Sequence, residues 1–460
     1  MTRFSIVIPA YNAEQFINQC LTSLENQTFR DFEVVCVDDA STDNTATVIE
    51  RFTARDRRFN LVRNNENMKQ FAARHIGVAQ TTGEYIAFLD ADDEFTIDAL
   101  EKLNSHLKKR PVDILQFEMQ IVADDAEVEV HADAWYSKKY EAAYFEGEEI
   151  MRAICMDRPD DVCVSHRVFN GDLAREALEG LGIVKGLYAG EDLAELMALM
   201  ALAKTYEIIN NAEYYIYHLG RGVNGSEGII SLEQFEKHSL SKWTSFKTLS
   251  EFLDKRSLNS QAIDEALDYR WAYACMQTLW YWNVSLEPRN HKEAMLGLAE
   301  LWPLDWLLPE TLLFIANDAE FLLACDESSC EETDDVIDRL AANIDSVGAL
   351  YGLGLSSSDG DSVSISDDMS PLYSIAETIC NLRNSIENRQ LSNYILEYCR
   401  LFALYHRATY SSMAQIRWFQ VREERLESAL RELSNSKAYK LGNMLAKPVR
   451  IVQGAIKRKA

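Results

Sequence analysis

Short apolar runs alternate with amphipathic stretches over the first hundred residues of the chain. The apolar runs predict strands, over residues 5–8, 32–37, 61–62 and 84–89. The stretches between them carry apolar residues at helical spacing and predict helices, over residues 14–26, 44–54 and 69–80. Asn12 precedes the first of these helices and is expected to cap it. Because the strands are apolar on both faces, we expect an α/β domain in which a mostly parallel sheet is covered by helices on both sides.

The pattern changes along the rest of the chain. Residues 98–228 mix strand and helix signals, whereas residues 232–350 read as mostly helical and are rich in tryptophan, leucine and alanine. A polar stretch, SSSDGDSVSISDDMS, reads as a linker. We therefore predict an α/β domain followed by a mainly helical C-terminal region, with parts at residues 1–228 (the α/β domain), 229–355 (a helical accessory region), 356–370 (the linker), 371–435 (a helical segment) and 436–460 (a basic amphipathic tail).

The charge of the chain restricts its partners. The formal net charge is −27 at pH 7, and a protein this acidic is not expected to bind nucleic acid. From Lys437 to the end, however, the chain has seven basic residues and no acidic residue. Apolar residues recur between these basic residues, which predicts an amphipathic tail able to make peripheral contact with an anionic membrane. A tail that frays or docks on the protein itself is the alternative.

Signals for a cellular compartment are few. No apolar run approaches the roughly 20 residues that span a bilayer, and no signal peptide precedes the first predicted strand. The nine cysteines are scattered and never have C-x-x-C spacing, as expected for reduced thiols. We expect a cytoplasmic protein, at the inner face of the cell membrane if its tail binds there.

Acidic residues follow two of the predicted strands. Asp39 comes after the second strand, and Asp90 and Asp92 come after the fourth, in the sequence FLDADDEF. Because ligands of parallel sheets bind beyond the carboxyl ends of the strands, these side chains are candidates for one site. Asp90 and Asp92 offer the carboxylate oxygens that Mg²⁺ or Mn²⁺ prefers, and such an ion could bridge a diphosphate. The alternative is an acidic turn whose side chains cap backbone N–H groups.

Asp39 and two further residues are candidates for chemistry. Asp39 could accept a hydrogen bond from the imide N–H of a nucleobase. Arg74, on the third predicted helix, could bind phosphate, although a solvated helical arginine is the usual interpretation of such a residue. Asp192 opens a helix and could act as a general base, or could simply be an acidic residue favoured at a helix N-terminus. The N-terminus keeps Asp192 ionised but is expected to weaken it as a base.

The order of these motifs is more specific than any one of them. IVIPAYNAEQFINQCLTSLENQTFRDFEVVCVDDASTDNT is followed by AARHIGVAQTTGEYIAFLDADD and then by GLYAGEDLAELMALMALAK. In this order the motifs resemble those of the family-2 glycosyltransferases with the GT-A fold, over about residues 3–228. The resemblance implies inverting transfer of a sugar from a nucleotide diphosphate sugar, usually UDP-linked, with Mn²⁺ or Mg²⁺ as cofactor.

The resemblance also implies residues that bind the donor. Ala10 and Tyr11 would line the nucleobase pocket, and Asp39 would bind the uracil. Arg74 matches the arginine that the family has near the nucleotide, and Asp90 would lie near the donor as well as the metal.

The resemblance assigns the remaining roles to carboxylates. Asp90 and Asp92 match the D-x-D motif that binds the metal, and Asp93 is expected to order the loop from behind them. Asp192 matches the general base. His75 departs from the family, which often has asparagine after the arginine.

These observations favour an enzyme that builds a cell-surface polysaccharide or a lipid-linked glycan precursor. Its partners would be a nucleotide-sugar donor and a glycan or lipid-linked acceptor. A catalytically silent binding or scaffold protein that keeps the fold within a glycan assembly complex is the alternative. A nucleotidyltransferase is disfavoured, because no glycine-rich, lysine-bearing phosphate loop follows the first strand.

Overall fold

The computed structural model describes residues 2–123, 141–156, 162–221, 229–258 and 260–302, with a few short stretches between 307 and 349. The predicted linker, helical segment and basic tail lie outside these described residues. The chain divides into two compact units, one made of Met1–Gly228 and Lys237–Arg270 and the other of Ile229–Glu236 and the residues from Trp271 on. The five parts proposed from the sequence stay a prediction.

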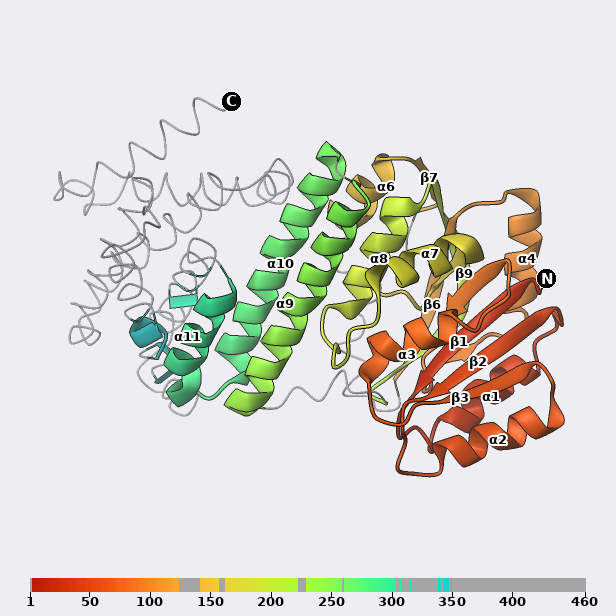
Figure 1. Cartoon of the computed structure of the whole chain (residues 1–460), viewed down its shortest axis with the longest axis horizontal. Coiled ribbons are helices and arrows are strands. Elements are labelled where there is room, and N and C mark those ends of the chain that lie inside the picture. Colours follow the sequence, from red (N-terminus) through yellow and green to blue (C-terminus); the bar gives the residue numbers. More distant parts are fainter. Residues whose placement is uncertain are drawn as a thin grey trace, which may run out of the picture. The chain divides into compact units, whose positions relative to one another are not determined.

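The first unit opens with the predicted alternation of strands and helices (Figure 1). The strands are β1 (Phe4–Ala10), β2 (Phe32–Asp38), β3 (Phe59–Arg63) and β4 (Tyr85–Phe88). The helices are α1 (Ile17–Glu25), α2 (Thr45–Arg55) and α3 (Lys69–Val78). The elements predicted from hydrophobic spacing are therefore confirmed, with their ends moved by a few residues.

The region of mixed signals completes the sheet and adds helices around it. Its strands are β5 (Glu94–Phe95), β6 (Ile114–Ala123), β7 (Ala143–Glu146), β8 (Arg167–Asn170) and β9 (Thr205–Leu219). Its helices are α4 (Ala99–Lys109), α6 (Glu149–Met151) with a π-helical turn at Arg152–Met156, α7 (Gly171–Leu181) and α8 (Glu191–Leu202).

The strands of the described residues form one nine-stranded sheet, in the order β3-β2-β1-β4-β8-β6-β9-β5, with β7 paired to β9. Strands β3, β2, β1 and β4 are parallel, whereas β8 is antiparallel to both β4 and β6. Because β1, β2 and β4 are parallel neighbours, the loops that follow them lie at one edge of the sheet. The acidic residues after β2 and β4 are thereby brought to that edge, as predicted.

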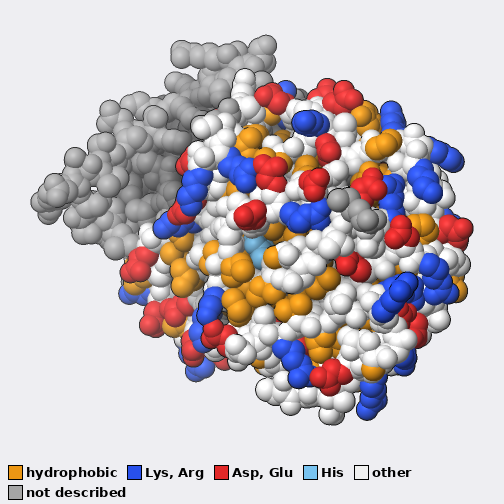
Figure 2. All heavy atoms as spheres, turned by 45° about the vertical axis from the view of Figure 1, so that its right-hand side comes forward, with side chains coloured by type: hydrophobic (Ala, Val, Ile, Leu, Met, Phe, Trp, Pro, Cys, Tyr) orange, Lys and Arg blue, Asp and Glu red, His pale blue; other side chains and the backbone are white. Residues whose placement is uncertain are grey.

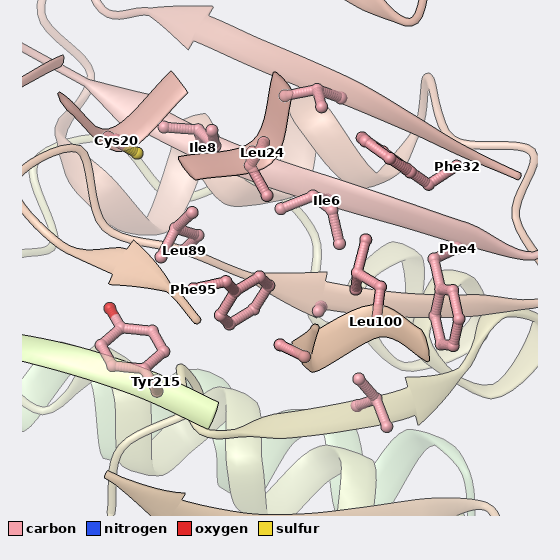
Figure 3. Close-up of a cluster of buried hydrophobic side chains, with 14 of the residues drawn as sticks. Phe4, Ile6, Ile8, Cys20, Leu24, Phe32, Leu89, Phe95, Leu100 and Tyr215 are labelled. Atoms are coloured by element: carbon pink, nitrogen blue, oxygen red, sulfur yellow. The ribbon is translucent and has the colours of Figure 1, made fainter. Parts of the chain in front are cut away.

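Alternate residues of β2 show how the two faces of the sheet are covered. Val34 and Cys36 belong to a large hydrophobic cluster that also contains the apolar side chains of α1 (Figure 3). Val35 and Val37 point the other way and pack with Ala73 of α3. Burial of both faces explains why the strand is apolar at each position from Val34 to Val37 and not at every second one.

Helix α3 packs closely against β1 at Gly77. A Cβ atom at this position would lie 2.5 Å from Cγ1 of Val7, so the approach requires glycine. This packing fixes the helix that carries Arg74 against the centre of the sheet.

Long helices follow the sheet, namely α9 (Leu232–Lys255), α10 (Gln261–Ser285) and α11 (His291–Leu301), with a 3₁₀ turn at Pro288–Asn290. The helical interpretation of this part is confirmed for the residues described. Within the second unit the buried Trp282 donates a hydrogen bond from Nε1 to the carbonyl of His291 (2.9 Å). None of the described helices is both long enough and apolar enough to span a bilayer. Acidic and basic side chains are interspersed on the face drawn in Figure 2.

Candidate active site

The carboxylate of Asp39 holds the start of α3. Asp39 follows β2, and its backbone N–H donates a hydrogen bond to the carbonyl of Ala10 at the end of β1 (2.8 Å). Its side-chain oxygens accept hydrogen bonds from Asn64 Nδ2 (2.7 Å) and from the N–H groups of Met68 (2.9 Å) and Lys69 (2.8 Å). Lys69 has φ of +73°, a left-handed conformation that costs free energy for a residue with a Cβ atom. Asp39 therefore stabilises a strained residue at the beginning of α3.

The loops after β1 and β2 are hydrogen-bonded to each other at the same edge. The side-chain oxygen of Asn12 accepts from the N–H of Thr42 (2.8 Å), and the N–H of Asn12 donates to Ser41 Oγ (3.0 Å). The prediction that Asn12 caps α1 is wrong, because its side chain joins the two loops and the helix begins later. Beside this link, Ala10 is buried and the side chain of Tyr11 is 47% exposed.

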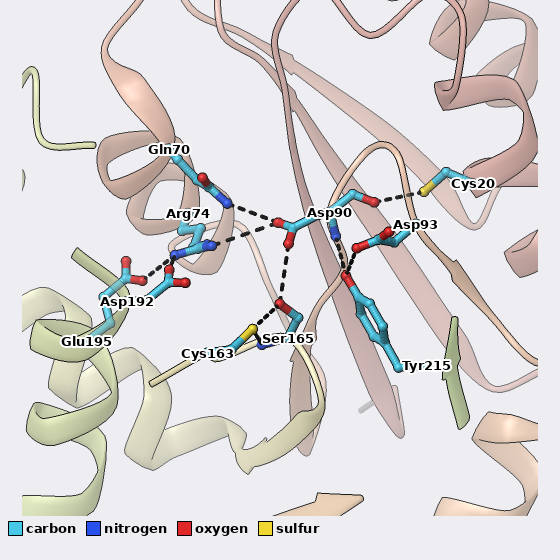
Figure 4. Close-up of polar contacts among 10 residues, drawn as sticks. All are labelled: Cys20, Gln70, Arg74, Asp90, Asp93, Cys163, Ser165, Asp192, Glu195 and Tyr215. Atoms are coloured by element: carbon cyan, nitrogen blue, oxygen red, sulfur yellow. Dashed lines mark hydrogen bonds and ion pairs between the residues drawn. The ribbon is translucent and has the colours of Figure 1, made fainter. Parts of the chain in front are cut away.

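Asp90 lies just beyond β4 and is held from two sides (Figure 4). One of its carboxylate oxygens accepts a hydrogen bond from Gln70 Nε2 (2.9 Å), and the other accepts one from Ser165 Oγ (3.3 Å). Its backbone N–H donates to the hydroxyl of Tyr215 (3.3 Å). Burial raises the pKa of Asp90 to about 6, although the nearby Arg74 opposes the rise. The side chain is still 26% exposed, so it remains within reach of a ligand.

The next two carboxylates of this loop are placed differently. Asp93 is buried and accepts hydrogen bonds from the Tyr215 hydroxyl (2.6 Å) and the N–H of His218 (2.8 Å). Burial, together with the charge of Asp90, raises the pKa of Asp93 to about 8. Asp92 stays partly exposed, and burial raises its pKa as well. Asp93 thus orders the loop from beneath, as predicted, and leaves Asp90 and Asp92 accessible.

Arg74 lies among three carboxylates (Figure 4). Its Nη1 donates to Asp192 and also to Glu195 Oε2 (2.8 Å). Its Nη2 lies 3.8 Å from Asp90 Oδ1. The Arg74 side chain is only 1% exposed, so the alternative of a solvated helical arginine is wrong. A direct contact between Arg74 and a phosphate stays a prediction.

His75, the residue that departs from the family pattern, contacts the same buried carboxylate. Its Nε2 lies 3.4 Å from Glu195 Oε1. Its ring packs on Phe71, with 4.1 Å between the ring centroids. Two consecutive residues of α3 therefore lie beside the two oxygens of Glu195, Arg74 at Oε2 and His75 at Oε1.

The first turn of α8 is anchored by the loop before it. Gly190 adopts φ of +77°, which glycine allows without strain. The neighbouring Ala189 donates from its N–H to Ser241 Oγ (3.1 Å) and accepts at its carbonyl from Ser245 Oγ (3.0 Å). Both serines belong to α9, so this helix fixes the position from which α8 starts.

Asp192 lies in this first turn of α8 with its side chain 29% exposed. Burial raises the pKa of Asp192 above its ordinary value, the Arg74 charge opposes this rise, and the Glu195 charge adds to it. The expectation that the helix N-terminus weakens Asp192 as a base is therefore outweighed. Asp192 combines access to solvent with more basicity than an ordinary aspartate.

Helix α3 links the predicted site residues. Its first residue is bonded to Asp39, its Gln70 is bonded to Asp90, and its Arg74 is bonded to Asp192. The structure thus brings Asp90 and Asp192 to the same arginine. Ala10, Tyr11 and Asp39 belong to the loops at the carboxyl edge of the same strands.

The sequence interpretation missed several side chains that shape this site, namely Gln70, Ser165, Glu195 and Tyr215. Most of them gave no signal, since single polar residues with ordinary spacing are common. Glu195 did give one, because it interrupts the apolar run LAELMALM on α8 and a charged residue in such a helix needs a buried partner.

The described residues include no group of three or more His, Cys, Asp or Glu side chains placed to hold a metal ion. Asp90 and Asp92 nevertheless fit a divalent ion, because Mg²⁺-type ions are commonly bound by one or two carboxylates together with substrate phosphates and water. Burial has raised the pKa of both carboxylates, so a cation beside them would stabilise their charged forms.

Comparison with known proteins bears on this geometry. Residues 5–156 match the family model for glycosyl transferase family 2. An uncharacterized glycosyltransferase of Haemophilus influenzae is 39% identical over 112 residues, which are 23% of this chain and 45% of that protein. The amylovoran biosynthesis glycosyltransferase AmsB of Erwinia amylovora is 40% identical over 101 residues, which are 22% of this chain and 34% of that protein. These alignments therefore span less than half the length of either relative.

Among solved structures, S. aureus TarS 1-349 in complex with UDP-GlcNAc is 18% identical, with a TM-score of 0.48 over 85% of this chain and 90% of that chain. The family match includes Asp39, Arg74, Asp90 and Asp92 but ends before Asp192. The sheet order and the motifs after β1, β2 and β4 agree with the family match, and residues 5–156 are therefore similar to glycosyl transferase family 2.

Proposed function

We propose that this chain is a metal-dependent, inverting glycosyltransferase that moves a sugar from a UDP-linked donor to a hydroxyl of a cell-surface polysaccharide or lipid-linked glycan precursor. The observation that carries the proposal is the meeting of Asp90 and Asp192 at the buried Arg74. A carboxylate suited to a metal and a carboxylate suited to accept a proton are thereby held beside each other, although 102 residues separate them (192 − 90).

Asp90 and Asp92 would hold Mn²⁺ or Mg²⁺. When bound, such an ion supplies positive charge that stabilises the leaving nucleoside diphosphate. The protein's part is to keep Asp90 in place, which Gln70 and Ser165 do through its two oxygens. Asp93 keeps the loop closed beneath them through the hydroxyl of Tyr215.

The nucleoside would bind at the loops after β1 and β2. Tyr11 presents an exposed ring beside Ala10, suited to stack on a base. The hydrogen bonds that the Asp39 carboxylate accepts come from residues 64–69, so a uracil imide N–H would share or replace one of them. The conformation at the start of α3 and binding of the base would then be coupled through Asp39.

Asp192 would act as the general base. It would take the proton of the acceptor hydroxyl as that oxygen forms its bond to the anomeric carbon of the donor sugar. The bond from the anomeric carbon to the diphosphate oxygen breaks on the opposite face, and the diphosphate leaves with the electron pair. A single displacement of this kind inverts the anomeric centre. Arg74 orients Asp192 for this role.

The relatives suggest the setting. Their names place them in the synthesis of surface polymers such as amylovoran and teichuronic acid. We propose that this chain acts in the cytoplasm on an acceptor at the inner face of the membrane, with the basic tail as its membrane contact.

A donor screen tests the proposal. Purified full-length protein is incubated with Mn²⁺, a bacterial lipid extract and each of a set of nucleotide sugars, and release of the nucleoside diphosphate is followed. We expect release with a UDP-sugar that is lost in EDTA, and NMR of the product should show an inverted anomeric configuration. Absence of release from every donor, or release of pyrophosphate, would overturn the proposal.

A further inference from the structure

Glu195 is a carboxylate that neither solvent nor substrate can reach. Its side chain is 0% exposed, and it lies one helical turn after Asp192 on α8. A buried carboxylate costs free energy unless partners compensate its charge. Arg74 is such a partner, through its hydrogen bond to Glu195 Oε2, whereas His75 Nε2 lies 3.4 Å from the other oxygen without a hydrogen bond.

Arg74 uses the same nitrogen for Glu195 and for Asp192. Nη1 donates to the buried carboxylate of Glu195 at 2.8 Å and to the partly exposed carboxylate of Asp192. The guanidinium is therefore held on its buried side by one carboxylate and holds the other at the edge of the site. The negative charge of Glu195 also offsets part of the positive charge of the Arg74 guanidinium that lies beside Asp192.

We propose that Glu195 is a positioning residue for Asp192, a role that rests on the proposed function. It fixes the direction of the Arg74 guanidinium and reduces its net charge, so that Asp192 is oriented by a hydrogen bond while remaining able to accept a proton. His75 lies on the other side of the carboxylate, where its ring, packed on Phe71, limits the room in which Glu195 can turn away from Arg74. This gives the histidine of this chain a function where the family often has asparagine.

The alternative is that Glu195 only forms a buried ion pair that stabilises the fold. The chain offers a control for that alternative. Glu207 on β9 is a largely buried carboxylate with its side chain 11% exposed, and it pairs with His106 Nε2 (3.1 Å) and Arg110 Nη1 (3.4 Å), whose side chains are 30% and 54% exposed. This second Glu–His–Arg trio lies where β9 pairs with β7, and none of its members is a proposed site residue.

The test compares Glu195→Gln with Glu207→Gln in the full-length protein. Turnover is measured as release of UDP from UDP-glucose and UDP-N-acetylglucosamine with Mn²⁺, giving kcat and KM for the donor. Affinity for UDP with Mn²⁺ is measured by calorimetry, and the unfolding midpoint of each variant is recorded. We expect Glu195→Gln to lower kcat about tenfold or more, with donor KM and UDP affinity within about twofold of wild type. Glu207→Gln should leave kcat within about twofold of wild type, even if its unfolding midpoint falls as much as that of Glu195→Gln.

His75→Ala provides a second test that keeps Glu195 in place. It removes the contact at Oε1 together with the packing of the ring on Phe71, and we expect kcat to fall about threefold to tenfold with donor KM unchanged. This variant decides the question if Glu195→Gln does not fold.

Three results would overturn the inference. They are wild-type kcat in Glu195→Gln, a loss of kcat that Glu207→Gln matches, or wild-type kcat in His75→Ala if only that variant folds. In each case an active wild-type protein would leave the proposed function standing. A wild-type protein that releases no UDP from any UDP-sugar of the donor screen would overturn both.

Discussion

Arg74 and Asp192 form an ion pair in the structure although 118 residues separate them in the sequence. The pair joins α3 to the first turn of α8 and lies beside Asp90, 3.8 Å from the other Nη of the arginine. Because Arg74 is buried, these carboxylates are held at fixed positions and not only attracted across solvent. Arg74 thus links the proposed base to the proposed metal ligand, which Gln70 and Ser165 also hold in place.

Replacement of Asp192 by asparagine should remove the general base and keep the shape of the site. We expect transfer to fall by a factor of about 10² to 10⁴, with UDP affinity in Mn²⁺ unchanged. Measurement of UDP release together with calorimetric UDP binding checks this. Asp172→Asn is the matched control, because Asp172 also lies in the first turn of a helix but is 92% exposed. A variant Asp192→Asn that retains wild-type turnover would exclude Asp192 as the base.

Removal of the metal should weaken nucleotide binding through Asp90. Ligand at a hundred times its dissociation constant stabilises a folded protein by about 2.7 kcal/mol, so UDP with Mn²⁺ should raise the unfolding temperature measurably. This increase should be lost in EDTA and largely lost in Asp90→Asn. Asp98→Asn serves as control, because Asp98 forms a surface ion pair with Lys102 (2.8 Å). An equal increase with UDP in EDTA and in Mn²⁺ would contradict the role of the metal.

The parallel half of the sheet could be predicted because its signals are local. Its strands contain short apolar runs, and each helix between them shows helical spacing, so a few neighbouring residues define each element. The pairing of β8 between β4 and β6, and the parallel pairing of β6 with β9, could not be read in this way. Those pairs join residues far apart in the sequence, and the choice among such pairings depends on the packing of the whole domain.

The same distinction between local signals and contacts made only in the folded protein applies to the residues of the candidate site. Asp39, Asp90 and Asp192 follow strands or open a helix, which made them visible as candidates. Gln70 and Ser165 act only through contacts that the folded structure creates, so nothing in their sequence surroundings distinguished them. Arg74 was found, but its burial was not, because its compensating carboxylates come from another part of the chain.

Asp93 should make the stability of the protein depend on pH. Its pKa is raised to about 8 in the folded state, so the folded state binds this proton more tightly than the unfolded chain. The contribution is complete below about pH 4 and is lost as the pH rises to about 8, at up to about 1.4 kcal/mol per pH unit. Asp93→Asn cannot titrate, and its free energy of unfolding should therefore rise relative to wild type between pH 5 and pH 8.

Urea unfolding in EDTA at several pH values measures this difference, and groups common to both proteins cancel in the comparison. Asp172→Asn, which removes a carboxylate that is 92% exposed, serves as the control. A difference between Asp93→Asn and wild type that does not change with pH would show that Asp93 titrates as in the unfolded chain.

Asp39 has a structural role in this structure and a proposed role toward uracil, and two substitutions separate them. Asp39→Asn should weaken the hydrogen bonds to Met68 and Lys69 and lower the free energy of unfolding by about 1–3 kcal/mol. Lys69→Gly should recover about 1 kcal/mol, because glycine adopts the φ of +73° without strain. If Asp39 binds uracil directly, the double variant regains stability but not UDP affinity, because the carboxylate that meets the imide N–H is still absent. If calorimetry shows that UDP affinity returns together with stability, Asp39 acts on the nucleotide only by holding α3.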